Sequence, residues 1–444
     1  MEQAAESTFV EGYVPTEHRP PRGTIVPTPG TDLALDEINL ADLATWGRLD
    51  IDGVLAKRRR ERPVGIDDHR SGGLPFWSFT RWADVAAITS NPDAFTSTMG
   101  VSVNNDPGKP DIAEGSMIVM DPPVHTAVRK LVNRGFTPRQ VRALAPAVQR
   151  RVDGLVERLR GLPSGPDGKV RIDYVTEVAA PLPAAVICDL MGIPEADQQR
   201  MIDLTNRLLS PTQYGVHASD LAGLIGEIDG YGLDLAKERL AQQREDLTSY
   251  LVNGQIADEP LRPDQIGGFF RLLVLAGNET TRTALSHGML ALTEWPEERA
   301  RWQAALATPA ADELAWAAAE EIVRWSSPVM HMKRQVTMDV EVGGVTLHQG
   351  DKVVVWYPAI NRDDAHIPDP YRFDIERAVN HHGGFGTGGP QFCLGANLAR
   401  REVAVTLSEL LRSFPDIAVD GAVMKVRSNF FHAISELPVS YTPR

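Results

Sequence analysis

Hydrophobic and polar residues follow two different patterns along this chain. From residue 121 to about residue 328 the pattern is helical, and Pro- and Gly-containing stretches interrupt it near residues 163–168, 192–194, 210–215 and 253–263. Residues 335–342 then alternate with the period of a strand, Gly343 and Gly344 predict a turn, and Lys352–Tyr357 reads as a buried strand. The pattern therefore predicts a mostly α fold with small β-sheets.

The first third of the chain is less regular. Residues 1–35 are polar and rich in Pro and Thr, which predicts an extended arm. Helices are expected at Asp42–Arg60 and Trp82–Asn91, with a short strand at Phe76–Phe79 between them. Residues 97–118 are typical of a loop, and Asp121 followed by two prolines predicts a capped helix start. Because no linker, repeat or charge block divides the interior, residues 36–444 are expected to form a single domain.

Composition excludes several classes of protein. The chain has 444 residues and a net charge of −14, from 59 acidic residues against 45 Lys and Arg, which argues against nucleic acid as a partner. Its two cysteines are too few for a disulfide framework, and Cys188 lies in an apolar run that is typical of core. No apolar stretch approaches the roughly 18 residues of a membrane span, and no signal region is evident. We expect a soluble, cytoplasmic protein.

The strongest chemical feature is the loop Gly383–Ala396, in which glycines surround the single Cys393. The residues that follow favour a helix, and the positive potential at a helix N-terminus is expected to lower the pKa of the thiol. No second cysteine is nearby, so zinc and iron–sulfur sites are not favoured. One thiolate ligand with an open metal face fits haem iron. The alternative is a small buried cysteine within a glycine-rich turn.

A second candidate site lies in the apolar segment Gly267–Arg282, which predicts a helix through the core. Ala276 and Thr280 are four residues apart and share a face, where a small Ala beside a Gly leaves room for a flat cofactor. Thr280 could then bind an oxygen ligand or a water, and Glu279 could supply protons. The alternative is a core helix in which Thr280 bonds a local carbonyl and Glu279 pairs with Arg282.

Two further pairs of residues have helical spacing. Glu321 and Arg324 are three apart and predict an ion pair on one helix face. His125 and Arg129 are four apart, so both could point at one anion. Each pair could equally belong to a helix surface.

The Cys393 loop resembles the haem-binding segment of the cytochrome P450 family, Phe-Gly-x-Gly-x-His-x-Cys-x-Gly. Gly389, Cys393 and Gly395 fall in register, Phe385 lies one position further upstream than is usual, and Gln391 replaces the His or Arg that binds a haem propionate. The segment from Ala276 to Thr281 resembles the family's distal-helix motif. Glu321 and Arg324 resemble its Glu-x-x-Arg motif.

The resemblance implies a P450 fold with haem b between the distal helix and the Cys393 loop. It implies that Cys393 ligates iron, that Thr280 and Glu279 manage protons while the O–O bond breaks, and that Arg372 completes the Glu321–Arg324 network. The remaining haem contacts that it implies are His125, Arg129 and Arg334 at the propionates, with Ala276, Phe385, Gly389, Gln391 and Gly395 around the cofactor.

The resemblance also implies an activity and partners. The expected reaction is hydroxylation of a lipophilic substrate with O₂ and with electrons from NAD(P)H, delivered by a ferredoxin reductase and a ferredoxin to a monomeric enzyme. The chain is similar to actinobacterial members that hydroxylate terminal carbons of methyl-branched fatty acids, isoprenoids and sterol side chains. The substrate pocket is expected at Met99, Val103, Ile118, Leu208, Leu272, Ala276, Val329, Met330 and Phe430. A docking patch for the acidic partner is expected at Arg134, Arg139, Arg142, Arg400 and Arg401. The alternative is that these are scattered surface arginines.

Other functions stay open from the sequence. The enzyme could oxidise a terpenoid or polyketide in a natural-product pathway, or it could use peroxide directly or isomerise its substrate. A non-catalytic haem-binding sensor or carrier is an alternative of another class. Dependence on a reductant and a substrate cavity beside the iron would distinguish them.

Overall fold

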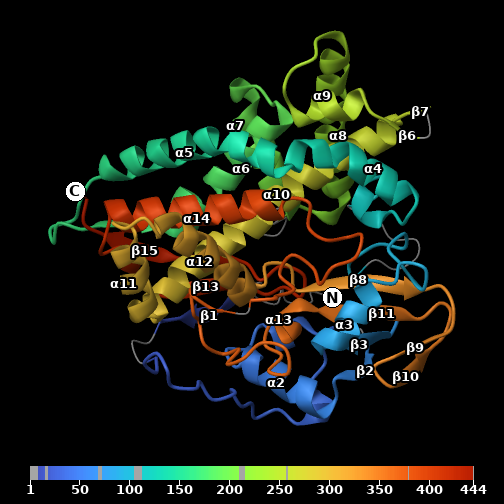
Figure 1. Cartoon of the computed structure of the whole chain (residues 1–444), viewed down its shortest axis with the longest axis horizontal. Coiled ribbons are helices and arrows are strands. Elements are labelled where there is room, and N and C mark those ends of the chain that lie inside the picture. The colour runs from blue at the N-terminus through green and yellow to red at the C-terminus, as the bar shows by residue number, and fades with distance from the viewer. Residues whose placement is uncertain are drawn as a thin grey trace.

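The structure is a computed structural model that describes residues 9–15, 19–68, 73–104, 113–209, 216–256, 259–378 and 380–443. Most helices gather in one part of the molecule, and the largest sheet lies with α2 (Ile51–Glu61), α3 (Trp82–Thr89) and α13 (Tyr357–Ile360) in the other (Figure 1). Parts of the predicted loop Met99–Ile118 and the predicted break at residues 210–215 fall outside the described residues. Small sheets beside many helices confirm the predicted fold class.

The helices are unequal in length, and the longest is α10. The α-helices are α1 (Leu43–Trp46), α2 (Ile51–Glu61), α3 (Trp82–Thr89), α4 (Val124–Val132), α5 (Pro138–Arg160), α6 (Pro181–Met191), α7 (Glu195–Leu209), α8 (Leu221–Ala241), α9 (Leu247–Val252), α10 (Pro263–Glu294), α11 (Pro296–Ala305), α12 (Ala311–Ser326), α13 (Tyr357–Ile360) and α14 (Ala396–Ser413). Short 3-10 turns cover Leu35–Glu37, Met117–Val119, Asn133–Phe136 and Ala218–Asp220, and a π turn covers Val175–Ala179.

The largest sheet has the strand order β2-β3-β11-β8-β4, in which only the β3–β11 pair is parallel. Its strands are β2 (Val64–Asp67), β3 (Phe76–Phe79), β4 (Phe95–Thr96), β8 (His331–Val336) and β11 (Lys352–Trp356). The smaller sheets are formed by β1 (Phe9–Tyr13) with β13 (Val423–Val426) and β14 (Ile434–Glu436), by β12 (Ala418–Val419) with β15 (Pro438–Tyr441) and β5 (Val170–Asp173), by β9 (Val340–Val342) with β10 (Val345–Leu347), and by β6 (Gln255–Ile256) with β7 (Glu259–Pro260).

Helix α10 crosses the main hydrophobic core and packs against α6, α8, α12 and α14. Its length follows from a long apolar sequence that begins with Pro263 at a position where proline is tolerated. Gly288 lets α14 approach closely, because a Cβ there would lie 3.0 Å from the Leu407 side chain. Within the described residues, no helix is both long and apolar enough to span a bilayer.

Several local predictions can be compared with the structure. Strand β3 matches the predicted Phe76–Phe79, and the predicted Gly343–Gly344 turn joins β9 to β10. The continuous helix expected at Asp42–Arg60 is wrong, because the chain breaks between α1 and α2. The Asp121 cap is also wrong: Pro123 occupies the cap of α4, and the Asp121 carboxylate accepts from the Ser97 main-chain N–H at 3.0 Å.

The described part of the N-terminal arm lies against the body of the protein. Strand β1 pairs with β13, and Arg22 forms an ion pair with Asp374. The arm is largely irregular from residue 19 to residue 34, as its composition predicts. Its contacts reach the network around Glu321.

Candidate active site

Cys393 lies at the end of the glycine-rich loop, three residues before α14 begins at Ala396. Its main-chain N–H donates to the Phe385 carbonyl at 2.9 Å, which closes the loop on itself. Gly395 forms the N-cap of α14, and its N–H bonds the Cys393 sulfur. The fold of the loop therefore fixes where the thiol points.

The electrostatics of Cys393 differ from the prediction. Burial raises the pKa of the thiol, although the Gly395 N–H and the charges of Arg129 and Arg400 lower it. The predicted lowering is wrong for the metal-free protein because desolvation outweighs the helix terminus. A thiol bound to a metal is deprotonated outright. The side chain is nevertheless accessible, so a ligand can reach the sulfur although many protein atoms surround it.

Helix α10 presents a second exposed position within the core. Ala276 is exposed and Thr280 is half-buried, whereas Leu275 and Asn278 beside them are 8% and 1% exposed. The face of Ala276 and Thr280 therefore borders open space, as the shared-face argument predicts. Gly277 does not add to that space, because a Cβ there would lie 3.0 Å from Ile187 of α6. The interpretation of Gly277 as room for a cofactor is wrong.

The two polar residues of this helix form local contacts. The Thr280 hydroxyl donates to the Ala276 carbonyl at 2.7 Å, and Glu279 Oε2 lies 3.3 Å from Arg282 Nη1. Burial raises the pKa of Glu279, and Arg282 lowers it. The buried atoms that lack a hydrogen-bond partner here are Glu279 Oε2, Arg282 Nε, Thr283 Oγ1 and both amide atoms of Asn278. Buried polar atoms rarely stay unbonded, so this cluster suits ordered water.

His125 lies near both Arg129 and Arg334. His125 is fully buried, and neither ring nitrogen has a hydrogen-bond partner. Burial lowers the pKa of His125, and the nearby charges of Arg129 and Arg334 lower it further. Arg129 also donates to the Pro390 carbonyl of the Cys393 loop at 3.1 Å, and its charge lowers the pKa of Cys393, so Arg129 lies close to the thiol. An orphaned donor between two cations fits a bound carboxylate, and haem propionates are of this kind.

The glycine-rich loop makes two contacts that the motif did not predict. Gln391 Nε2 donates to the Met120 carbonyl at 2.9 Å, which ties the loop to the segment before α4. Gly389 has a φ of 74°, and a Cβ there would lie 2.2 Å from the Thr89 carbonyl oxygen. Gly389 is thus required by contact with the end of α3. Phe385 is buried, and the Arg400 guanidinium lies 4.5 Å from its ring centroid.

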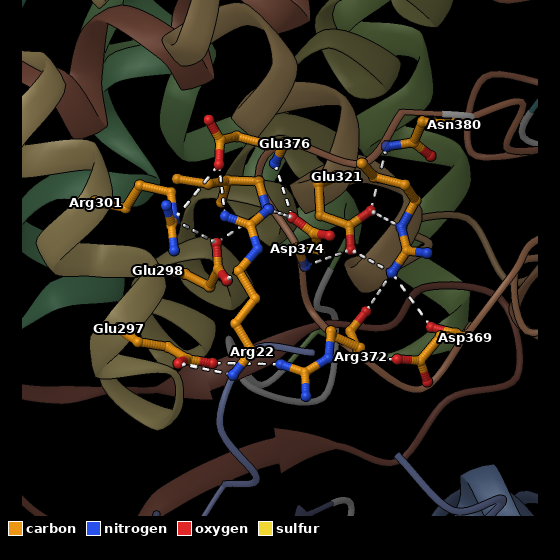
Figure 2. A network of polar contacts seen from close by, with 12 residues as sticks. Arg22, Glu297, Glu298, Arg301, Glu321, Asp369, Arg372, Asp374, Glu376 and Asn380 are labelled. Atoms are coloured by element: carbon orange, nitrogen blue, oxygen red, sulfur yellow. Dashed lines mark hydrogen bonds and ion pairs between the residues drawn. The ribbon is translucent and has the colours of Figure 1, made fainter. Parts of the chain in front are cut away.

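Glu321 belongs to a network of polar contacts with several other charged side chains (Figure 2). Arg324 donates to both of its carboxylate oxygens at 2.7 Å, and both side chains are fully buried. The predicted third member, Arg372, does not contact this carboxylate with its guanidinium. Arg377 does so instead, from Nε at 3.1 Å and from Nη2 at 3.3 Å. The assignment of Arg372 as the third guanidinium is therefore wrong.

Arg372 has a different set of partners. Its main-chain carbonyl accepts from Arg324 at 3.0 Å and from Arg377 at 2.6 Å. Its guanidinium donates to the carbonyls of Pro20, Pro21 and Thr24, and it lies 3.3 Å from Glu297. Arg372 therefore anchors the N-terminal arm to the network. The sequence alone does not indicate which of Arg372 and Arg377 binds Glu321, since both follow the same proline-rich turn.

The predicted pocket residues divide into three groups by exposure. Leu208 belongs to the main core, and Val103 and Met330 belong to a second core beside the largest sheet, so these three side chains are packed. Met99 and Ala276 are exposed. The half-buried members are Ile118, Leu272, Val329 and Phe430.

Only some of the arginines in the predicted basic patch are exposed, whereas others contact a charged or aromatic side chain. Arg139 and Arg142 are exposed on α5. Arg400 pairs with Glu320 at 2.6 Å, and Arg401 lies 5.9 Å from the Trp316 ring centroid. The Arg134 side chain lies outside the described residues. A surface depression beside the Cys393 loop adds Lys130, together with Arg129, Asn133 and Pro390.

Comparison with known proteins agrees with this geometry. The sequence profile of the family described as cytochrome P450 matches residues 233–425. A methyl-branched lipid omega-hydroxylase of Mycobacterium tuberculosis is 40% identical over 94% of this chain and 97% of its own length. A steroid C26-monooxygenase of the same organism is 31% identical over 95% of this chain and 96% of its own length. A solved cytochrome P450 of Mycobacterium marinum, in complex with pseudoionone, has a TM-score of 0.83 and 35% identity, covering 92% of this chain and 100% of its own.

Proposed function

Because the chain belongs to the cytochrome P450 family and is a monooxygenase that hydroxylates lipophilic substrates, we propose that it acts on the terminal carbon of a methyl-branched chain. The substrate class is a branched fatty acid, an isoprenoid or a sterol side chain. The relatives named as a lipid omega-hydroxylase and a steroid C26-monooxygenase both support a terminal position. The complex of a similar P450 with pseudoionone supports an isoprenoid-like ligand.

The observation that carries the proposal is the position of Arg129, which lies close to Cys393 and beside His125, a residue that also lies near Arg334. One exposed thiol in a closed loop lies near two cations and a buried imidazole with no partner. This set fits haem b, with Cys393 on iron and the other three residues at the propionates. When bound, haem supplies the activation of O₂ that inserts one oxygen atom into a C–H bond, with the thiolate donating electron density.

The residues of α10 would manage the protons that this reaction consumes. The Thr280 hydroxyl donates to the Ala276 carbonyl, so its oxygen still has lone pairs that can accept a hydrogen bond from a water. Glu279 is buried, and burial raises its pKa, which favours the protonated form that a proton donor needs. The charge of Arg282 lowers the pKa of Glu279. Movement of the Glu279 side chain from Arg282 toward a water bound by Thr280 would therefore change the pKa of the carboxyl and its ability to donate a proton.

We further propose that electrons come from NAD(P)H through a ferredoxin reductase and a ferredoxin. Lys130 borders the depression beside the Cys393 loop, and Arg139 and Arg142 are exposed on α5, so positive charge is available on this part of the chain despite the net charge of −14. Ferredoxins are acidic as a class, so steering toward this surface is expected. The rates of reduction should then fall with rising ionic strength.

The test is a spectral screen of branched fatty acids, isoprenoids and sterols with the haem-loaded enzyme, followed by product analysis. We expect a ligand-induced shift of the haem spectrum and a terminal alcohol that requires O₂ and the reductase chain. Cys393→His should abolish the thiolate spectrum and the product. Products from a polyketide but from no lipid would favour the natural-product alternative. Turnover with peroxide alone, or spectral binding without any product, would contradict the proposal.

A further inference from the structure

His331 joins two segments of the chain that are far apart in sequence. Its Nε2 accepts from the main-chain N–H of Val103 at 2.8 Å, and its Nδ1 lies 2.7 Å from the Asn429 carbonyl oxygen. The side chain is fully buried at the first position of β8. Since Nε2 accepts, the ring hydrogen must be on Nδ1, where it is donated to Asn429. A single neutral tautomer therefore satisfies both bonds.

The first segment continues the pairing of β4 along β8. Thr96 pairs with Gln335 in the sheet, and Lys333 N–H donates to the Val101 carbonyl at 2.6 Å. At Val103 the His331 side chain replaces the next strand-to-strand bond. Further along the chain, Gly115 packs against α10, because a Cβ there would lie 2.8 Å from the Asp264 carbonyl oxygen. The described chain therefore contacts the sheet at residues 101–103 and α10 at residue 115.

The second segment also approaches α10. Met330 N–H donates to the Phe430 carbonyl at 2.8 Å, and the Phe430 ring meets the His331 ring edge-on, 5.1 Å between centroids. The next-but-one residue, His432, lies 4.3 Å from the ring of His287 on α10. His287 follows Thr280 by seven residues, which is about 10 Å along a helix. Segment 429–432 therefore lies about two turns from the candidate catalytic threonine.

We propose that His331 is a positioning residue that holds residues 99–103 and 429–431 as one wall of the substrate site, and so sets which carbon is hydroxylated. The inference rests on the proposed function. Met99 is exposed and Phe430 half-buried on these segments, so both have apolar surface to offer a lipid. Neighbouring carbons of an alkyl chain are little more than about 1 Å apart along it, and shifts of that size already alter reactivity about a hundredfold. Selection of one carbon therefore requires a fixed wall.

Three substitutions of His331 test its two hydrogen bonds separately. His331→Phe keeps an aromatic ring and removes both bonds. His331→Gln places an amide near the Nε2 position and retains an acceptor for Val103, whereas His331→Asn places one near Nδ1 and retains a donor for Asn429. His366→Phe is the control, because His366 also joins two segments, through the His381 carbonyl at 2.9 Å, and stacks on Trp82.

The first measurement is amide hydrogen exchange of Val103 in the haem-loaded enzyme. We expect about tenfold faster exchange in His331→Phe and His331→Asn, and no change in His331→Gln or His366→Phe. The second is the ratio of terminal to penultimate alcohol from a branched fatty acid. This ratio should fall several-fold in His331→Phe and stay unchanged in His366→Phe.

The outcomes are distinct. Unchanged Val103 exchange or an unchanged product ratio in His331→Phe would overturn the inference. If His331→Phe does not take up haem, Val103 exchange and the product ratio are measured on His331→Gln and His331→Asn, which each keep one bond, and these two variants then decide. A wild-type enzyme that hydroxylates none of the lipids would contradict the proposed function instead, because it leaves the exchange of Val103 unaffected.

Discussion

Glu279 and Arg282 form an ion pair across one turn of α10, with 3.3 Å between Oε2 and Nη1, while Thr280 between them bonds the Ala276 carbonyl. Both charged side chains are at least nine-tenths buried, at 2% and 5% exposure. The acid is therefore held by its own helix and not by a neighbouring element. Arg282 favours the ionised form of Glu279, whereas burial, which raises its pKa, favours the protonated form that a proton donor needs.

Glu279→Gln should slow product formation by about a hundredfold, the lower end of the usual contribution of a general acid. The amide is similar in shape but cannot release a proton. The solvent isotope effect on turnover should rise, because proton transfer becomes more rate-limiting. Glu313→Gln changes an exposed carboxylate on α12 and should leave both quantities unaltered. Unchanged turnover in Glu279→Gln would remove this residue from proton delivery.

Thr280→Ala should uncouple electron use from product. Without the hydroxyl, the water that it orders is lost, so NAD(P)H consumption continues while peroxide replaces the alcohol. Ser286→Ala is the matched control, since Ser286 bonds the Arg282 carbonyl at 2.8 Å within the same helix and is fully buried. The ratio of product to NAD(P)H consumed decides, and equal coupling in both variants would contradict the assignment.

Arg377→Ala should destabilise the protein more than Arg372→Ala. Arg377 donates twice to the fully buried Glu321, and removal of one partner from such a pair costs about 3–5 kcal/mol. Arg372 supplies its main-chain carbonyl to the network, and that carbonyl persists in the variant. Its loss should cost about 1–3 kcal/mol, from the carbonyls of the N-terminal arm. Denaturant unfolding measures both, and a larger loss in Arg372→Ala would contradict this order.

The comparison of these two arginines shows what the sequence could predict. Local chemistry was readable: the apolar run of α10, strand β3 and the single Cys393 in a glycine-rich loop each follow from patterns within a few residues. Contacts between residues far apart in the sequence could not be predicted in this way. Arg372 and Arg377 have the same side chain in one turn, and the path of the chain alone decides which reaches Glu321.

Other failures have the same origin. Asp121 has the right type and place for a helix cap, but Ser97 from a distant segment takes its carboxylate. Gly277 stands beside Ala276 in a familiar motif, yet its neighbour is Ile187 of α6. The prediction for the Cys393 thiol used the helix terminus and omitted desolvation, which depends on everything packed around it. The two hydrogen bonds of His331 could not be predicted from the sequence, since both go to main-chain atoms of distant segments.

His125→Phe should weaken haem binding without weakening the haem-free fold. Neither ring nitrogen of His125 has a partner in the protein, so an apolar ring of similar shape removes an unsatisfied buried group. With haem bound, the lost donor to a propionate should speed haem transfer to an acceptor such as apomyoglobin about tenfold. Thermal unfolding of the haem-free variant and its transfer rate separate these effects. An unstable haem-free variant would indicate that His125 is structural.

Glu294 should make the stability of the protein depend on pH near neutrality. Burial raises the pKa of this carboxyl, at the end of α10, from 4.5 to about 7. The folded state therefore binds the proton more tightly than the unfolded state does, and its stabilising effect is complete below about pH 4.5 and is lost as the pH rises through about 7. The full effect would be about 3 kcal/mol, and Arg19, at 3.1 Å from the carboxylate, reduces it by favouring the ionised form. Glu294→Gln should flatten the fall in unfolding free energy between pH 5 and pH 8, whereas Glu313→Gln should retain the wild-type slope. A steeper fall in Glu294→Gln would show that Arg19, together with the Tyr13 hydroxyl bonded to the same carboxyl, outweighs desolvation.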